Sequence, residues 1–249
     1  YDPLLPEWLA LYAQVDPAAV ANAWRQRLTQ LDEQYRWGDF YLCASERQRD
    51  WWLGLLEANG RINPFTYAAD PSLRRLIDLV PYGLESRRPQ RRQPVMKGVW
   101  PGLTGDDHIV LWGGGLWPWL DPLTAIRAMS QIWQQRQDVK LVFPGTRHPN
   151  PDMATVSTQA AAAKELAEQL GLLDRAVFFG DWVPFAAWDD VLLECDLALT
   201  LHFDTLETRL AFRSRIFEYI RADLPVVATV GDATAELITS YGLGRCVAF

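Results

Sequence analysis

The clearest candidate for ligand chemistry is a run of three glycines that follows an apolar segment. Residues 109–112 are all apolar, which is typical of a buried strand, and the glycines occupy positions 113–115. Asp121 and Pro122 then predict the cap and the first position of a helix. Glycines let a backbone approach a ligand closely, and the N-terminus of a helix favours phosphate. The loop is therefore either a phosphate site or only a tight turn between strand and helix.

A second group of polar side chains surrounds a predicted helix near residue 215. On a helix, Arg213 and Arg215 would lie roughly 200° apart, so only one of them could face a ligand. The carboxylate of Glu218 could accept hydrogen bonds from two ribose hydroxyls. It could equally pair with Arg215 or Arg221 on the helix surface.

The three histidines differ in their relation to the predicted strands. His202 ends a strand on the side where open parallel sheets bind ligands, and it is the histidine we favour for the ligand pocket. His108 opens a strand, and His148 lies in a loop from which it could approach a ligand. No pair of them has the close spacing of metal ligands, so no metal site is expected.

Other polar and aromatic side chains allow structural as well as functional roles. Trp117 and Trp119 could stack on a ligand or cover the core. Asp189 and Asp190 are expected on a solvated helix face.

The composition is that of an ordinary globular chain. Of the 249 residues, 49% are hydrophobic and 22% charged, which excludes disordered, collagen-like and coiled-coil classes. The net charge of −7 lacks the basic excess of a nucleic-acid binder, so no nucleic-acid partner is expected. Three widely spaced cysteines without a CxxC pair indicate reduced thiols and a cytoplasmic location. No apolar stretch is long enough for a membrane span, and the first residues lack a signal-peptide pattern.

From His108 onward, apolar strand-like runs alternate with helical periodicity. This order predicts an α/β fold, with a Rossmann-like parallel sheet that carries helices on both faces. The expected strands are 109–112, 139–143, 176–179, 196–201, 225–229 and 245–248, and the expected helices are 122–137, 154–170, 185–194, 212–222 and 233–241.

The first 85 residues contain too few strands for a sheet of their own. The pattern predicts a helix over 17–36, a strand over 40–44, a helix from the Ser45 and Gln48 capping box to Gly60, a short helix over 71–76 and a strand over 77–83. We therefore expect part of a second Rossmann-like domain over 1–85. An arginine-rich solvated linker over 86–107 and a domain over 108–249, truncated at its end, would follow.

A nicotinamide-dependent enzyme is a weak alternative. A G-x-G-x-x-G fingerprint would begin at Gly113, but Pro118 stands where its third glycine belongs. No acid closes the second strand over residues 140–144. NAD binding is therefore disfavoured.

Several segments together resemble the carboxyl-terminal portion of a family 4 (group 1) glycosyltransferase of the GT-B fold. The resemblance covers nearly the whole chain and rests on the order and spacing of its segments rather than on a single motif. These segments are the glycines at 113–115, Phe-Gly-Asp-Trp-Val-Pro at 179–184, Cys-Asp-Leu-Ala-Leu at 195–199, and Phe217-Glu218 through Leu224-Pro225-Val226-Val227.

The resemblance implies transfer of a hexosyl or related sugar, with retention, from a nucleotide-diphosphate sugar to an acceptor. Residues 108–249 would bind the donor, and residues 1–85 would belong to the acceptor side. The acceptor, whether a glycan, a lipid-linked molecule or a small molecule, stays open. The implied protein is a bacterial cytoplasmic enzyme that needs no metal or other cofactor. Peripheral membrane association through parts outside this chain stays open, and this fragment alone need not be active.

The resemblance also assigns roles by position. Glu218 matches the second acid of the family's Glu-(seven residues)-Glu motif and would hold the ribose hydroxyls. The remaining donor-binding positions are Gly113, Gly114, Gly115 and Leu116 for the diphosphate, Asp181, Trp182 and Val183 for the base, and Phe212, Arg213 and Ser214 for sugar and phosphate.

The chain departs from the family pattern at two places. Leu210 stands where the first acid of the motif belongs, and Glu207 could replace that acid. The arginine and lysine that usually grip the diphosphate after the glycine loop are missing, so Arg213 or Arg147 would have to supply the charge. We therefore expect Arg213, His202 and Glu207 as catalytic residues. The alternative is a non-catalytic nucleotide or sugar binding module on the same fold.

Overall fold

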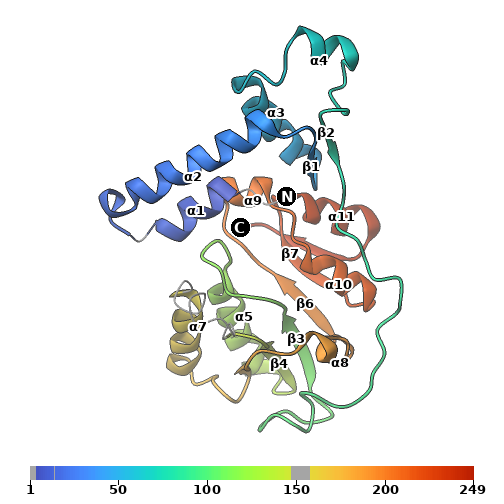
Figure 1. Ribbon diagram of the computed structural model, residues 1–249. Helices are drawn as coiled ribbons and strands as arrows, with labels where there is room; N and C mark the ends of the chain where they lie inside the picture. Colours follow the sequence, from blue (N-terminus) through green and yellow to red (C-terminus); the bar gives the residue numbers. More distant parts are fainter. Residues whose placement is uncertain (1–3, 14, 147–157) are drawn as a thin grey trace. The chain divides into compact units, whose positions relative to one another are not determined.

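The computed structural model describes residues 4–13, 15–146 and 158–249. The chain forms two compact units, each described by itself (Figure 1). The first unit comprises Tyr1–Tyr82 and Thr205–Phe212, and the second comprises Gly83–Asp204 and Arg213–Phe249.

The second unit is built on a six-stranded parallel sheet with the order β5-β4-β3-β6-β7-β8. This confirms the predicted α/β class and its parallel sheet. Strand β3 lies inside the sheet, and all of its residues after His108 are buried, which explains the apolar run over 109–112. The strands are β3 (His108–Trp112), β4 (Val139–Phe143), β5 (Val177–Phe179), β6 (Leu197–Thr200), β7 (Val226–Thr229) and β8 (Gly244–Val247).

Helices connect successive strands of this sheet. Helices α5 and α7 lie on one side of the sheet and α10 and α11 on the other, as Figure 1 shows. Asp121 caps α5 and Asp232 caps α11 by accepting backbone N–H groups of the first turn. The helices are α5 (Pro122–Gln135), α7 (Thr158–Gln169), the 3-10 turn η1 (Phe185–Ala187), α8 (Trp188–Leu193), α10 (Arg215–Arg221) and α11 (Ala233–Tyr241).

The first unit contains a strand–helix–strand step in which β1 and β2 pair in parallel. Its core joins Leu31 and Tyr35 of α2 to Trp52 and Leu56 of α3 and to Ile77 of β2. The elements are α1 (Leu4–Tyr12), α2 (Pro17–Trp37), β1 (Tyr41–Cys43), α3 (Glu46–Ala58), α4 (Pro64–Ala69), β2 (Ile77–Leu79) and α9 (Leu206–Leu210).

The short helix expected over 71–76 is wrong. These residues form turns, and Leu73 has a positive φ of 57°, which a helix does not allow. The helix of this region, α4, lies earlier because Asn63 and Thr66 form a capping box there. Helices α1 and α9 were not expected from the sequence.

The arginine-rich segment after Gly83 is anchored to helix α8 of the same unit. Asp190 Oδ1 accepts the backbone N–H groups of Arg92 and Gln93 at 2.6 and 3.3 Å. The carboxylate of Glu194 is fully buried and accepts three backbone N–H groups from residues 95–97, each at 2.8 Å. Asp189 and Asp190 are 7% and 2% exposed, so the solvated face expected for them is wrong. Asp190 and Glu194 therefore hold residues 92–97 against helix α8 within the second unit.

The edge of the sheet requires a glycine at the start of β8. A Cβ atom added to Gly244 would lie 1.8 Å from the backbone oxygen of Val226, its partner on β7. We expect Gly244→Ala to lower the free energy of unfolding by about 1–3 kcal/mol, because the two strands must separate. Gly105→Ala is the matched control, since a Cβ there meets nothing within 4 Å. Urea-induced unfolding would measure both, and equal effects would contradict the steric argument.

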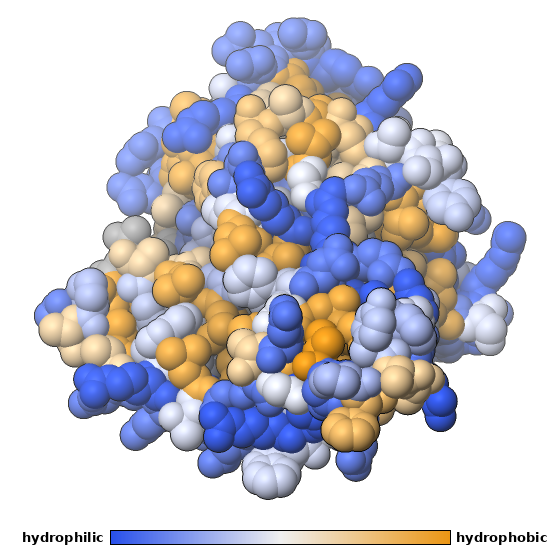
Figure 2. Space-filling model, turned by 90° about the horizontal axis from the view of Figure 1, so that it is seen from above, coloured by the Kyte–Doolittle hydropathy of each residue, from blue (hydrophilic) through white to orange (hydrophobic). Residues whose placement is uncertain are grey.

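The surface mixes polar and apolar residues. On the face seen in Figure 2, hydrophobic areas alternate with hydrophilic ones instead of merging into one continuous patch. Among the described residues, no helix is both long enough and apolar enough to cross a membrane.

Candidate functional site

The strand order defines where a ligand should bind in the second unit. From β3 the chain continues outward to β4 and β5, and it then returns to the other side of β3 to form β6, β7 and β8. Ligands of such sheets bind beyond the carboxyl ends of the strands, at the point where the order reverses. The loops that follow β3 and β6 therefore meet at the expected position.

These two loops are joined by backbone hydrogen bonds. The N–H of Asp121 donates to the carbonyl of Leu201 at 3.0 Å, and that of Phe203 donates to the carbonyl of Trp119 at 3.2 Å. Trp117 stacks on Trp119 with a centroid distance of 5.5 Å and an interplanar angle of 6°. The two indoles thus pack on each other at the edge of the glycine loop.

The glycine loop packs tightly against helix α10. The Gly113 N–H donates to Tyr219 Oη at 3.1 Å, and a Cβ on Gly113 would lie 2.5 Å from that oxygen. Gly114 has a φ of +90°, a conformation that favours glycine. Leu116 is 3% exposed and belongs to the core. The loop therefore serves a close helix contact, and that contact is compatible with a ligand on its outer side.

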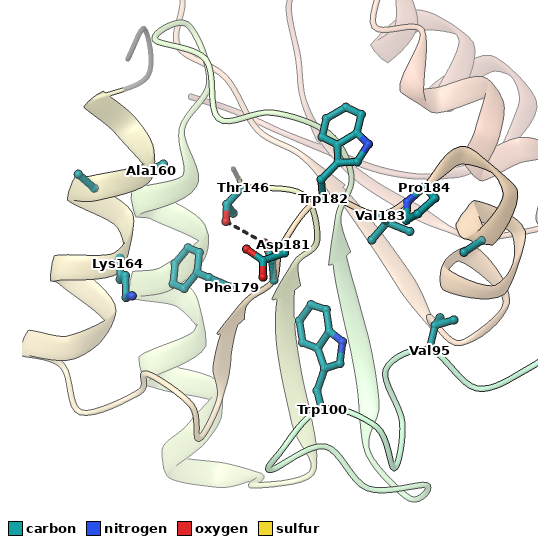
Figure 3. Close-up of a pocket in the computed structure, with 13 residues that line it drawn as sticks. Val95, Trp100, Thr146, Ala160, Lys164, Phe179, Asp181, Trp182, Val183 and Pro184 are labelled. Atoms are coloured by element: carbon teal, nitrogen blue, oxygen red, sulfur yellow. Dashed lines mark hydrogen bonds between the residues drawn. The ribbon is translucent and has the colours of Figure 1, made fainter. Parts of the chain in front are cut away.

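A pocket of about 730 Å³ lies beyond the ends of β4 and β5 (Figure 3). In Figure 3 the side chain of Asp181 lies between Thr146 and Trp100, and the Trp182 indole points away from Trp100. Aromatic walls with a few polar groups are typical of a small-molecule site. The lining residues are Val95, Trp100, Thr146, Ala160, Ala161, Lys164, Phe179, Gly180, Asp181, Trp182, Val183, Pro184 and Ala187.

Two contacts fix the floor of this pocket. Thr146 Oγ1 donates to the carbonyl of Gly180 at 3.0 Å, which ties the loop after β4 to the loop after β5. Trp100 covers Gly180 so closely that an added Cβ would lie 2.1 Å from its ring. The anchored segment before β3 thus supplies one wall of the pocket.

The structure brings three of the expected donor-binding residues, Asp181, Trp182 and Val183, into this pocket. It adds Trp100 and Val95, which sequence reasoning missed because their segment was interpreted as a linker. Arg147, which was expected to bind the diphosphate, and His148 lie outside the described residues.

A buried polar cluster lies behind β6 and β7. His202 Nε2 is 3.2 Å from Asp232 Oδ2, and Arg213 Nε is 3.4 Å from the same oxygen. The side chains of His202, Asp232 and Arg213 are 0%, 1% and 7% exposed. The other carboxylate oxygen of Asp232 accepts from the Ala235 N–H at 2.7 Å and the Thr234 hydroxyl at 2.8 Å.

The electrostatics of the cluster favour an ionised Asp232. Burial alone would raise the pKa of its carboxyl group, but the contacts with His202, Arg213 and the Ala235 N–H outweigh burial and lower that pKa. Two of the expected catalytic residues, His202 and Arg213, are therefore brought together by one buried carboxylate. The third, Glu207, is 2% exposed on α9 of the first unit.

The remaining expected residues have separate surroundings. Glu218 Oε2 accepts two hydrogen bonds from Arg221 at 3.1 and 2.8 Å, as its surface-pairing alternative requires. Arg221 also donates to Asp189 at 2.6 Å. Ser214 precedes α10 and is exposed, whereas Phe212 belongs to the first unit and stacks on Tyr82 with a centroid distance of 5.6 Å.

The described residues contain no group of three or more His, Cys, Asp or Glu side chains arranged to hold a metal ion. The three cysteines are free thiols. Burial raises the pKa of Cys43 to about 11, so its thiol is protonated at neutral pH.

The fold has close counterparts among solved structures. WaaG, a glycosyltransferase involved in lipopolysaccharide biosynthesis, matches with a TM-score of 0.63 and 16% identity over 95% of this chain and 58% of its own. HepE from Anabaena, in complex with UDP and glucose, matches with a TM-score of 0.58 and 16% identity over 86% of this chain and 50% of its own. Sucrose-phosphate synthase from Thermosynechococcus elongatus matches with a TM-score of 0.55 and 18% identity over 90% of this chain and 49% of its own.

The protein thus has the α/β fold of GT-B glycosyltransferases, with a six-stranded parallel sheet flanked by helices. The chain spans about half the length of these proteins. Identities this low establish the fold alone. The sequence matches no protein-family model and no curated protein.

Proposed function

We propose that the chain is the donor-binding part of a group 1, family 4 glycosyltransferase that transfers a hexosyl or related sugar with retention. The observation that carries this proposal is the position of the pocket and the glycine loop on one edge of a GT-B sheet. Residues 108–249 would bind the nucleotide-diphosphate sugar, residues 86–107 would connect the domains, and residues 1–85 would belong to the acceptor side.

The nucleotide base would lie in the pocket after β5, and the diphosphate would extend toward the glycine loop after β3. Strands β5, β4 and β3 are neighbours, so the ends of β5 and β3 are about 10 Å apart. Aromatic rings of Trp100 and Phe179 suit a flat base, and Asp181 offers an acceptor for its N–H groups. HepE was solved with UDP and with UDP-glucose, which makes a uridine donor the first candidate.

The other residues named for the donor and the sugar have separate proposed roles. Glu218 would hold the ribose through Oε1, because Arg221 takes Oε2. In the second unit, Arg213 and His202 would be catalytic and Ser214 would bind the donor. The catalytic role of Glu207 and the donor-binding role of Phe212 are proposed separately for the first unit. The transfer would need no metal, and the protein would work in a bacterial cytoplasm. The acceptor and any peripheral association with a membrane stay open.

A non-catalytic nucleotide or sugar binding module is the second candidate. It is favoured by Asp121, whose carboxylate caps the helix after the glycine loop and places negative charge where phosphate would approach. Consumption of a nucleotide-sugar by the full-length protein would exclude the module. Binding without turnover would favour it.

Calorimetric titration with UDP, GDP, ADP and NAD tests the donor site. We expect one nucleoside diphosphate to bind, and we expect Ala161→Trp to weaken that binding at least about tenfold because the new indole fills the pocket. Glu168→Trp is the matched control, since this exposed residue lies about 10 Å further along α7.

The possible results separate the alternatives. Binding that is indifferent to Ala161→Trp would move the base elsewhere. Failure of every nucleoside diphosphate to bind would refute the donor site, and tight NAD binding would revive the nicotinamide alternative.

A further inference from the structure

The guanidinium group of Arg215 lies against the glycine loop. The loop itself and the first turn of α5, which follows it, contain no lysine or arginine. Arg215 begins helix α10. A Cβ atom placed on Gly114 would lie 3.4 Å from both Cζ and Nη2 of Arg215, which is ordinary van der Waals contact. The φ of +90° at position 114 is what favours glycine there, and the guanidinium lies beside this residue of the loop.

Helix α10 holds this arginine in place through a second contact with the same loop. Tyr219 follows Arg215 by four residues, so the two side chains lie on the same face of the helix. The Tyr219 hydroxyl is fully buried and accepts the Gly113 N–H at 3.1 Å. Burial raises the pKa of Tyr219 to about 12, against an opposing effect of the Arg215 charge. The tyrosine therefore stays neutral and fixes the register of helix and loop.

Two other sources of positive potential at this loop are already engaged. The Gly113 N–H is bound to Tyr219, and the first turn of α5 is capped by the Asp121 carboxylate, which accepts the Thr124 N–H at 3.0 Å. Arg213 is 7% exposed and lies 3.4 Å from the buried Asp232. Its charge is directed into the protein rather than toward the loop.

We infer that Arg215, rather than Arg213, binds the diphosphate of the donor. Arg215 would replace the cations that are missing after the glycine loop, whereas Arg213 holds the Asp232 and His202 cluster together. A guanidinium presents N–H groups in a planar fork that matches phosphate oxygens. This inference rests on the proposed function, because it assumes that a nucleoside diphosphate reaches this edge of the sheet.

Paired titrations test the inference on the full chain. Uridine, guanosine and adenosine are compared with UDP, GDP and ADP for the unmodified protein, Arg215→Ala, Arg215→Lys and Arg245→Ala. We expect Arg215→Ala to weaken binding of the diphosphate about 10- to 100-fold and to leave nucleoside binding unchanged. Arg215→Lys should lose less, because it keeps the charge but not the fork. Arg245 is an exposed arginine on β8, so Arg245→Ala removes the same charge at a distant position. This control should change neither nucleoside binding nor diphosphate binding.

The outcomes distinguish failure of the inference from failure of the proposed function. Unchanged diphosphate binding in Arg215→Ala overturns the inference and leaves the donor site intact. Equal weakening of nucleoside and diphosphate also overturns it, because the arginine would then support the pocket generally. If the unmodified protein binds no nucleoside diphosphate at all, the proposed function and the inference both fall.

Discussion

Replacing Glu194 with alanine should lower the free energy of unfolding by about 3–5 kcal/mol. Its carboxylate is fully buried after helix α8 and accepts the N–H groups of Val95, Met96 and Lys97, each at 2.8 Å. Hydrogen bonds to a charged acceptor are the strong class, and alanine would leave three backbone donors without it. The free energy of unfolding of Glu194→Gln should lie between those of the original protein and Glu194→Ala. A glutamine keeps one acceptor oxygen, but its amide nitrogen cannot accept a backbone N–H.

The same substitution should disturb the pocket, since residues 95–97 lead directly to Trp100, which covers Gly180. Urea-induced unfolding would measure the stability, and amide hydrogen exchange would report on Val95, Met96 and Lys97. These amides should exchange faster in Glu194→Ala. The exposed Glu168 on α7 is the control, and its alanine variant should stay within about 0.5 kcal/mol of the original. Unchanged protection of the three amides would refute the anchoring role of Glu194.

Much of the sheet could be predicted because most of its strands are apolar runs and the long helices have their own periodicity. The order of β3 to β8 and the caps Asp121 and Asp232 follow from such local signals. Helix α9 has five residues, too few for a periodic pattern, and was missed. The helix expected over 71–76 failed because Asn63 caps an earlier one and Leu73 turns the chain.

The site was predictable where it depends on strand ends and unpredictable where it depends on tertiary contacts. Asp181, Trp182 and Val183 follow a strand, and a parallel sheet brings strand ends to one edge. The contact between Trp100 and Gly180 joins segments far apart in sequence, and nothing local encodes it.

The two arginines show how strongly the outcome depends on a helix boundary. The sequence predicts a helix from residue 212, on which Arg213 and Arg215 would lie on different faces. Helix α10 begins at Arg215, so Arg213 precedes the helix and contacts Asp232 from the segment before it. A shift of three residues in the helix start thus decides which arginine faces the glycine loop.

Replacing Asp232 with asparagine should cost about 3–5 kcal/mol, because it removes the buried negative charge that faces His202 and Arg213. Asparagine is as good a helix cap as aspartate, so the cap of α11 survives. Its amide nitrogen donates where Oδ2 faced Arg213, so the acceptor for Arg213 is lost together with the charge. Asp121→Asn is the matched control: this aspartate also caps a helix, and asparagine there should change stability by less than about 0.5 kcal/mol.

The pH dependence shows whether the charge of Asp232 causes the effect. The folded protein lowers the pKa of Asp232 below its ordinary value of 3.8. Ionised Asp232 therefore contributes stability that is fully present above pH values near 4 and is lost as the pH falls through the folded pKa. The difference in unfolding free energy between the original protein and Asp232→Asn should accordingly shrink as the pH falls below about pH 4. A difference that stays the same at pH 3, or that equals the effect of Asp121→Asn at pH 7, would show that the buried charge does not stabilise this end of the sheet.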